Sequence, residues 1–366
     1  MQDASRGGAQ LAVQASPQGQ TDARETLCVA IASGGRESLL RTLDSIAAQR
    51  LERALTLKIA VADDSTDGAT TARVNAWLQR EGANAPPVAT CRVGARNIAI
   101  ARNACLDLAG DATYLAFIDD DEWAAPDWLE RMVRALDAFN ADAVVGPVFP
   151  HYPADTPAWL VAANPMHVPW GKRGRVLTTG RTSNVLMRYD GFRRAGLTFD
   201  ERLGRTGGED TAYFYAAHCA GLKLVATDDA KVFERVPAAR LQRGYLKTRM
   251  LRAGQTYAQL MLSPQMATQT GGSGQASQGH GGDDHRGHGH RGLDHGRLGR
   301  STMWTAWRLV RFGDALGKCA LAYALSGLLR PLDRGRALRM RMRAWLNRGK
   351  VRHFIGAPLP EMYGGG

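Results

Sequence analysis

Two groups of carboxylates in this sequence directly follow apolar segments, where their spacing could hold a metal ion. Asp119-Asp120-Asp121 follows residues 114–118, and Asp63-Asp64 ends the apolar run 57–62. Two carboxylates at positions i and i+2 of a turn can hold a divalent cation and a sugar hydroxyl together, and Mg²⁺ or Mn²⁺ prefer such oxygen ligands. Asp is also common in loops and at helix N-caps. Two clusters, each after an apolar run, favour a binding site over that simpler interpretation.

The segments around these carboxylates alternate between strand-like and helix-like patterns. Short apolar runs predict strands at residues 27–32, 57–62, 114–118 and 143–149, and apolar residues at helical spacing predict helices around residues 39–46, 98–108 and 128–139. This alternation predicts a Rossmann-like α/β fold with a mixed, mostly parallel sheet that is covered on both faces. Ligands bind beyond the carboxyl ends of strands in such sheets, so we expect both acidic clusters in one site.

Composition excludes several other classes of protein. The 366 residues are 44% hydrophobic, which is enough for a sizeable core. No apolar run approaches the roughly 20 residues of a membrane-spanning helix, and the polar first 25 residues are not expected to form a secretory signal. The five cysteines are scattered without a C-x-x-C pair, which favours free thiols in a reducing compartment.

The chain divides into four segments by composition. We expect a disordered tail at residues 1–25, a catalytic domain at 26–260, a flexible Gly/His-rich linker at 261–300 and a basic helical segment at 301–366. The last segment contains 12 Lys/Arg and 3 Asp/Glu, a net charge of +9 out of +12 for the whole chain. The basicity therefore belongs to a C-terminal helical appendage.

This appendage has two possible partners besides the rest of the protein. An apolar helix followed by an Arg-rich amphipathic helix is typical of a segment at an anionic membrane surface. A helical pair that packs on the main domain is the alternative. Nucleic acid is not expected, because Trp345 is the only aromatic residue between Arg334 and Lys350.

Three segments, in this order, resemble the family 2 glycosyltransferases with their A-type nucleotide-sugar-binding fold. They are VADDSTDG (61–68), ARNACLDLAGDATYLAFIDDDEWAAPDWL (101–129) and FDERLGRTGGEDTAYFYAAHCAGLKL (199–224). The FIDDDEW run and the ERVP and RLQRGYLKTR segments are most similar to succinoglycan-type exopolysaccharide glycosyltransferases. The resemblance covers about residues 26–260.

The resemblance implies a nucleotide site at the first strand ends. Asp63 and Asp64 match the acidic pair that contacts the base and ribose, and Arg102 and Asn103 match a motif near the nucleotide. The loop after the first strand, with Ser33 and Arg36, lacks the family's usual aromatic residue. We still expect this loop to face the nucleotide, with the backbone amides of its glycines near a base or phosphate.

The resemblance also implies the metal site and the catalytic group. Asp121 matches the metal ligand, and Asp119 matches a ribose contact that can share the metal. Glu234 stands where a metal-binding His is common, and an ion pair with Arg235 is the alternative. Asp210, beside Glu209, matches the general base, although this segment would also suit a helix N-terminus. Arg249 corresponds loosely to an arginine that faces the diphosphate.

Two further residues are candidates for sugar contacts. Trp123 could stack on a sugar ring, although a Trp at such a position is more often part of the core. Asn184 lies in a region that faces the donor sugar and the acceptor in the family.

We therefore predict an inverting, Mn²⁺- or Mg²⁺-dependent glycosyltransferase. Its donor would be a nucleotide-sugar, with UDP-sugar preferred, and its acceptor a polyprenyl-diphosphate-linked saccharide. A Q-x-x-R-W motif is absent, which favours transfer of one sugar at a time. We expect the protein in the cytoplasm, peripheral at the inner face of the membrane. The alternatives are a sugar-nucleotide pyrophosphorylase and a catalytically idle membrane- or nucleic-acid-binding scaffold.

Overall fold

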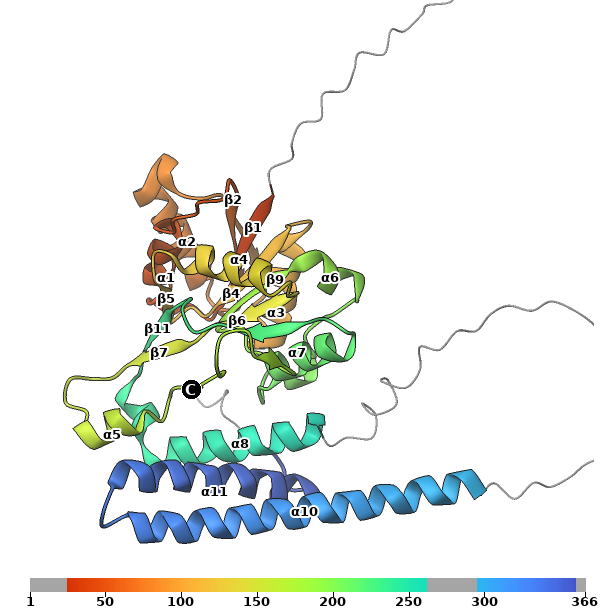
Figure 1. Ribbon diagram of the computed structural model, residues 1–366. Coiled ribbons are helices and arrows are strands. Elements are labelled where there is room, and N and C mark those ends of the chain that lie inside the picture. Colours follow the sequence, from red (N-terminus) through yellow and green to blue (C-terminus); the bar gives the residue numbers. More distant parts are fainter. Residues whose placement is uncertain (1–24, 262–294, 360–366) are drawn as a thin grey trace, which may run out of the picture.

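A computed structural model describes residues 25–261 and 295–359 of the chain (Figure 1). The predicted tail at 1–25 and most of the predicted linker at 261–300 therefore lie outside the described residues. The linker's last residues are an exception, because a long helix already begins at His295.

The part of the chain before α8 is built on one mixed sheet of eight strands. Their order is β3-β2-β1-β4-β9-β6-β10-β8. The first four strands in that order run parallel, whereas β9 is antiparallel to both of its neighbours. The strands are β1 (Thr26–Ser33), β2 (Thr56–Asp63), β3 (Val88–Arg92), β4 (Tyr114–Ile118), β6 (Ala143–Val145), β8 (Val176–Leu177), β9 (Asn184–Arg188) and β10 (Leu224–Ala226).

Helices cover both faces of this sheet, because its strands are apolar on both sides. Leu27, Val29 and Ile31 of β1 pack in one core, and Cys28 and Ala30 pack in the other. The first core is closed by α1 (Leu39–Ala47), α2 (Ala69–Glu81) and α4 (Trp128–Ala138). The second is closed by α3 (Ile98–Ala109), α6 (Tyr189–Arg194) and α7 (Glu209–Cys219).

The predicted strand at 143–149 is in fact two strands in two sheets. It breaks at Gly146 and Pro147, between β6 and β7 (Val148–His151). Proline cannot donate a ladder hydrogen bond, and a Cβ on Gly146 would lie 2.5 Å from the Asn184 side-chain nitrogen. The second strand joins a small sheet of order β5-β11-β7, with β5 (Glu122–Ala124) and β11 (Val232–Arg235).

Three long helices form a separate layer beneath the sheet domain (Figure 1). They are α8 (Arg243–Met261), α10 (His295–Leu329) and α11 (Arg334–Phe354), and α5 (Ala158–Ala163) packs against α11. Trp345 of α11 is buried against α8. The predicted C-terminal helices are therefore present, and α11 lies on α8. Three short 3₁₀ helices complete the described elements: η1 (Gly82–Asn84), η2 (Glu201–Leu203) and η3 (Ala238–Leu241).

Helices α8 and α11 cross at a contact between two glycines. A Cβ on Gly254 would lie 1.9 Å from the Leu346 carbonyl oxygen, and a Cβ on Gly349 would lie 2.1 Å from that of Leu251. Only glycine permits this approach of the two backbones. Among the helices that the structure describes, none has the length and apolar content to cross a membrane.

Candidate active site

A cleft of about 1430 Å³ lies between the carboxyl ends of the strands and the helical layer. One wall comes from the residues after β1 and β4, and the other from α8 and α11. Ten of the fourteen predicted site residues line it: Ser33, Arg36, Asp64, Arg102, Asp119, Asp121, Glu209, Asp210, Glu234 and Arg249. The edge of the sheet at which the sequence predicted the site is therefore where the cleft lies.

Asp120, in the middle of the acidic run, ties this run to the loop after β1. Its carboxylate accepts a hydrogen bond of 2.7 Å from the Ser33 hydroxyl and one of 3.1 Å from Arg36. Burial raises the pKa of Asp120 to about 6, against the opposing effect of Arg36. The altered loop after β1 thus positions the acidic run, whether or not it also contacts a nucleotide.

Asp121 and Glu234 converge on a single guanidinium group. Arg240 donates to Asp121 at 3.3 Å and forms an ion pair with Glu234, and Arg36 approaches Asp121 at 2.6 Å. Burial and the nearby Asp121 raise the pKa of Glu234, whereas Arg240 lowers it. The ion pair considered for Glu234 therefore exists, but with Arg240 in η3 instead of Arg235.

The same two carboxylates are the candidate metal ligands. Both contact the Arg240 guanidinium, and Mg²⁺-type sites often use one or two carboxylates together with substrate phosphates. In residues 25–261 and 295–359, no group of three or more His, Cys, Asp or Glu side chains could hold a metal by itself. The residues thus fit a site that substrate phosphates would complete, with Arg240 turned away.

Arg102 joins the end of β4 to the start of α7. It donates to Asp119 at 3.2 Å and forms a buried ion pair with Glu209. Burial raises the pKa of both carboxyls, and Arg102 lowers it. Glu209 Oε2 is buried and accepts no hydrogen bond from the described residues. A buried oxygen without a hydrogen-bond partner is uncommon in folded proteins and often marks a functional position.

Asp210 is the second residue of α7, which begins directly after two glycines with positive φ. Gly207 and Gly208 have φ values of +77° and +94°. A Cβ on Gly208 would lie 2.5 Å from Thr256 of α8, so only glycine fits. Both hydrogen bonds to the Asp210 carboxylate come from Thr211 and reach Oδ1. The interpretation as a helix start is confirmed, and it presents Asp210 to the cleft.

Arg249 forms a basic region on the α8 side of the cleft. Its guanidinium donates to the Pro165 carbonyl oxygen at 3.4 Å and lies near Arg181. Burial and Arg181 lower the pKa of Arg249 to about 10. Two neighbouring guanidinium groups at a cleft wall favour an anionic ligand.

Asp63 and Asp64 organise the loops around the nucleotide side of the cleft. Asp63 is fully buried and accepts hydrogen bonds from Ser65 and Thr71, so it does not line the cleft. Asp64 lines the cleft and accepts from the backbone amides of residues 95–97. Asp63 therefore acts on the site through the loop that follows it.

Three predicted contacts are corrected, because these side chains lie outside the cleft. Asn103 is hydrogen-bonded to the backbone of Phe199. Trp123 stacks on Phe233 at 5.7 Å between ring centroids and packs under Arg41. Asn184 is buried, and both ends of its amide are occupied by Trp128 and by two backbone carbonyls. All three hold the fold together.

Sequence reasoning missed several residues that the structure brings to the site. Asp120 lies in the acidic run, but the D-x-D pattern points to its neighbours Asp119 and Asp121. Thr182 lies in the same predicted sugar-facing loop as Asn184, and Thr182 instead of Asn184 lines the cleft. The others had no local signal, because they reach the cleft only through long-range packing: Arg181, Arg240, Leu346 and Lys350. The Thr182 hydroxyl is buried with no hydrogen-bond partner among the described residues.

Acidic turns follow β2 and β4, and a carboxylate stands at the start of α7, all at one edge of the mostly parallel sheet. This arrangement is that of a glycosyltransferase of the A-type fold. A family model described as "Glycosyl transferase family 2" matches residues 28–198. The chain is also 36% identical over 229 residues to the succinoglycan biosynthesis protein ExoM of Rhizobium meliloti (strain 1021). That match covers 62% of this chain and 72% of ExoM. The chain belongs to glycosyl transferase family 2, as the sequence predicted.

One solved structure supports the fold. The mannosyltransferase PcManGT from Pyrobaculum calidifontis, in complex with GDP-Man and Mn²⁺, matches with a TM-score of 0.54 and 18% identity. The match covers 90% of this chain and 87% of PcManGT. S. aureus TarS 1–349 in complex with UDP-GlcNAc is less similar, with a TM-score of 0.46, 11% identity and coverage of 91% and 92%. In a longer TarS structure the chain spans 43% of the length.

Proposed function

We propose that this glycosyltransferase moves one sugar from a UDP-sugar to a hydroxyl of a lipid-linked saccharide, with inversion at the anomeric carbon. The observation that carries the proposal is that Asp210 and the acidic run after β4 line the same cleft. That cleft is large enough for a nucleotide-sugar and an acceptor hydroxyl together. One displacement at the anomeric carbon then requires a base on one side and a stabilised leaving group on the other.

Asp210 is the proposed base. An acceptor hydroxyl is a poor nucleophile, so a carboxylate within hydrogen-bond reach must take its proton. Thr211 occupies Oδ1 of Asp210, which leaves Oδ2 for that proton. Glu209 and Thr182 are proposed to orient sugar hydroxyls, because each has a buried oxygen that no described residue satisfies.

The leaving group is a nucleoside diphosphate, whose negative charge grows as the bond breaks. Arg36, Arg240 and Arg249 line the cleft and would stabilise that charge. Asp121 and Glu234, with Asp119 nearby, would hold a Mn²⁺ or Mg²⁺ ion, which when bound supplies further positive charge at the diphosphate. Asp64, Ser33 and Arg102 are proposed to face the nucleotide.

The acceptor is proposed to be a polyprenyl-diphosphate-linked saccharide used in exopolysaccharide assembly. Similarity to ExoM, a succinoglycan biosynthesis protein, supports this class of acceptor. The enzyme would then work as a peripheral protein at the inner face of the cell membrane. The net charge of +9 in residues 301–366 supports an anionic surface as its partner.

Ligand-induced stabilisation tests the donor site. We would measure the melting temperature with UDP, GDP, CDP or TDP, each with and without Mn²⁺, for the wild type and Asp121→Ala. A ligand that binds only the folded state raises the melting temperature with occupancy. We expect UDP to stabilise the wild type in the presence of Mn²⁺, and Asp121→Ala to lose that increment. No shift with any nucleotide in the wild type would contradict the proposal.

A further inference from the structure

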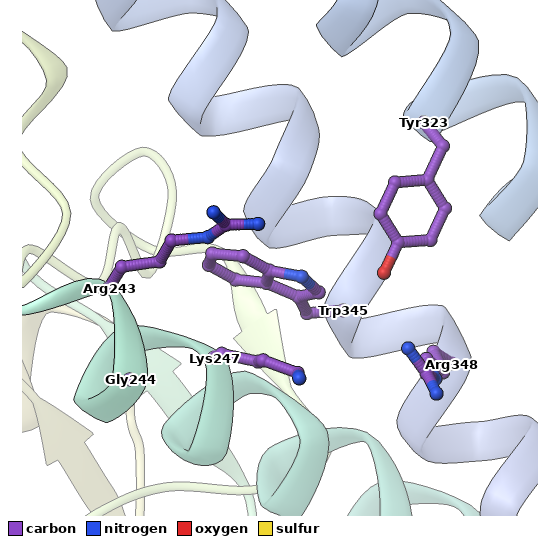
Figure 2. A pocket seen from close by; sticks show the side chains of 6 residues that line it. All are labelled: Arg243, Gly244, Lys247, Tyr323, Trp345 and Arg348. Carbon is purple, nitrogen blue, oxygen red and sulfur yellow. The ribbon is translucent and has the colours of Figure 1, made fainter.

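A second, smaller pocket of about 330 Å³ lies where α8, α10 and α11 meet (Figure 2). Arg243 and Lys247 of α8 extend on either side of the Trp345 indole, and Arg348 lies further along α11. Tyr323 of α10 closes the group. The pocket therefore combines three cations with an aromatic floor and has no acidic residue in its lining.

These three cations have no compensating charge in the described structure. Arg243, Lys247 and Arg348 make no ion pair with any described residue, whereas Arg36, Arg102 and Arg240 of the cleft pair with carboxylates. Trp345 is only 2% exposed, so its side chain is held in place by packing and forms a rigid floor of the pocket. Three unpaired cations around a rigid aromatic surface would bind a phosphate group.

The outward face of α10 beside this pocket is apolar and uncovered. Five large side chains on it are each between 50% and 70% exposed: Leu309, Val310, Leu316, Leu321 and Leu328. The positions between them on that face carry no charge: Gly313, Gly317, Ala320, Ala324 and Gly327. Leu316 lies two turns from Tyr323, so this apolar face borders the pocket.

We propose that the pocket binds the phosphate of an anionic phospholipid while the apolar face of α10 enters the membrane interface. The charge of the pocket suits an anionic headgroup, and the uncharged apolar face beside it favours a lipid surface over a nucleic acid, whose every unit carries a phosphate. The proposal rests on the proposed membrane-side function and deepens it by naming the surface.

The geometry also explains what this docking would achieve. Helix α8 carries Arg243 in the pocket and Arg249 in the cleft, and α11 carries Trp345 in the pocket and Leu346 in the cleft. The two sites therefore lie on opposite sides of the same two helices. A membrane bound at the pocket would lie one helical layer from the cleft, close to the saccharide end of a lipid-linked acceptor.

Vesicle sedimentation tests the proposal with the full chain. Phosphatidylcholine vesicles with and without phosphatidylglycerol are the probes, and the variant carries three substitutions: Arg243→Gln, Lys247→Gln and Arg348→Gln. We expect the wild type to bind only the anionic vesicles, and the variant to bind them about 100-fold more weakly. A second variant, Leu321→Ser with Leu328→Ser, should also lose binding while keeping all three cations.

A charge-matched control removes three exposed cations from the catalytic domain: Arg50→Gln, Lys172→Gln and Lys231→Gln. This control should keep vesicle binding. Equal losses in the control and in the pocket variant would overturn the proposal, because binding would then depend on net charge alone. Pocket-dependent binding of inorganic phosphate or RNA, without vesicle binding, would also overturn it.

The same samples separate this proposal from the proposed function. Stabilisation by UDP with Mn²⁺, and turnover with a water-soluble acceptor, should be unchanged in the pocket variant. Loss of nucleotide binding in the wild type would count against the donor site alone. Absence of vesicle binding in a wild type that still binds UDP would count against the lipid pocket alone.

Discussion

Ion pairs between arginines and carboxylates balance the charge of the cleft and join residues that lie far apart in the chain. Arg36 compensates Asp120, Arg102 compensates Asp119 and Glu209, and Arg240 compensates Glu234. A nucleoside diphosphate would bring further negative charge into this arrangement. Under the proposed function, guanidinium groups would exchange carboxylate partners for phosphates when a donor binds.

Replacement of the proposed base tests its role directly. Asp210→Asn keeps the shape of the side chain but cannot accept the acceptor proton. We expect kcat to fall by roughly 10²–10⁴-fold, since general base catalysis typically contributes that much, while UDP binding is retained. The measurement is steady-state turnover beside thermal stabilisation by UDP. Asp190→Asn, an exposed carboxylate on α6, is the matched control and should keep full turnover.

Asp121 and Glu234 share Arg240 as an ion-pair partner. We therefore expect Arg240 and a metal ion to compete for these two carboxylates. Arg240→Gln removes the cation that now neutralises both carboxylates, so Mn²⁺ should bind about tenfold more tightly. Glu234→Gln should have the opposite effect, because it removes an oxygen ligand. The melting temperature of each variant is measured against Mn²⁺ concentration with UDP present. The midpoint of each curve is the Mn²⁺ concentration that gives half of the full stabilisation. Identical midpoints in the two variants would show that these residues do not hold the metal.

Asp63 predicts a pH-dependent contribution to stability. Burial raises its pKa, but the hydrogen bonds from Ser65 and Thr71 outweigh that effect and lower it to about 2. The unfolded value is about 3.9, so the stabilisation is complete above that pH and is lost as the pH falls towards 2.

We therefore expect Asp63→Asn to lower the free energy of unfolding by about 2 kcal/mol at neutral pH. The difference in free energy of unfolding between this variant and the wild type should become smaller below about pH 4. Urea unfolding across this pH range measures it. Asp111→Asn, at an exposed turn, should differ little from wild type at any pH. If the difference in free energy of unfolding between wild type and Asp63→Asn stays constant in acid, the pKa of Asp63 is not lowered.

At the scale of elements, the sequence predicted the strands that carry the acidic clusters and missed those inserted between them. Runs of apolar residues identify β1, β2 and β4, because a strand buried on both faces has no polar alternation. The antiparallel β9 between β4 and β6 has an apolar run of only three residues, 185–187, and its sequence does not show where in the sheet it inserts. Pairing of distant strands depends on tertiary packing, and so do the cleft contacts of Arg240 and Lys350.

The start of α7 depends on glycine for two separate reasons. Gly208→Ala would place a Cβ against Thr256 at a φ of +94°, so we expect a loss of about 1–3 kcal/mol in stability and a marked fall in kcat as Asp210 moves. Thermal unfolding and turnover measure the two effects.

Gly221→Ala is the matched control for that substitution. Its φ of +88° is similar, but nothing lies within 4 Å of the added Cβ. It should lose some stability and keep its kcat. Equal losses of kcat in both variants would mean that backbone strain alone, and not the contact with α8, governs the site.

At the scale of the whole molecule, the glycine contact between α8 and α11 joins the helical layer to the active site. Gly349→Ala would push the two backbones apart, because its Cβ would lie 2.1 Å from the Leu251 carbonyl oxygen. We expect a loss of about 1–3 kcal/mol in the free energy of unfolding and a higher KM for the acceptor, as Leu346 and Lys350 withdraw from the cleft.

Gly317→Ala on α10 is the matched control for that change. No atom lies within 4 Å of its added Cβ, so alanine should stabilise the helix by up to about 1 kcal/mol. Urea unfolding and acceptor titration compare the two variants. An unchanged KM in Gly349→Ala, despite lower stability, would show that the helical layer does not contribute to acceptor binding.

The contribution of Leu346 and Lys350 to the cleft wall has a consequence for synthesis on the ribosome. The acidic run and Asp210 are translated well before these residues, so a nascent chain has the chemical groups before it has the closed cleft. Such a chain would hold Asp210 open to water and lack the surface against which an acceptor rests. Transfer would therefore begin only after residue 350 has emerged and α11 has packed on α8.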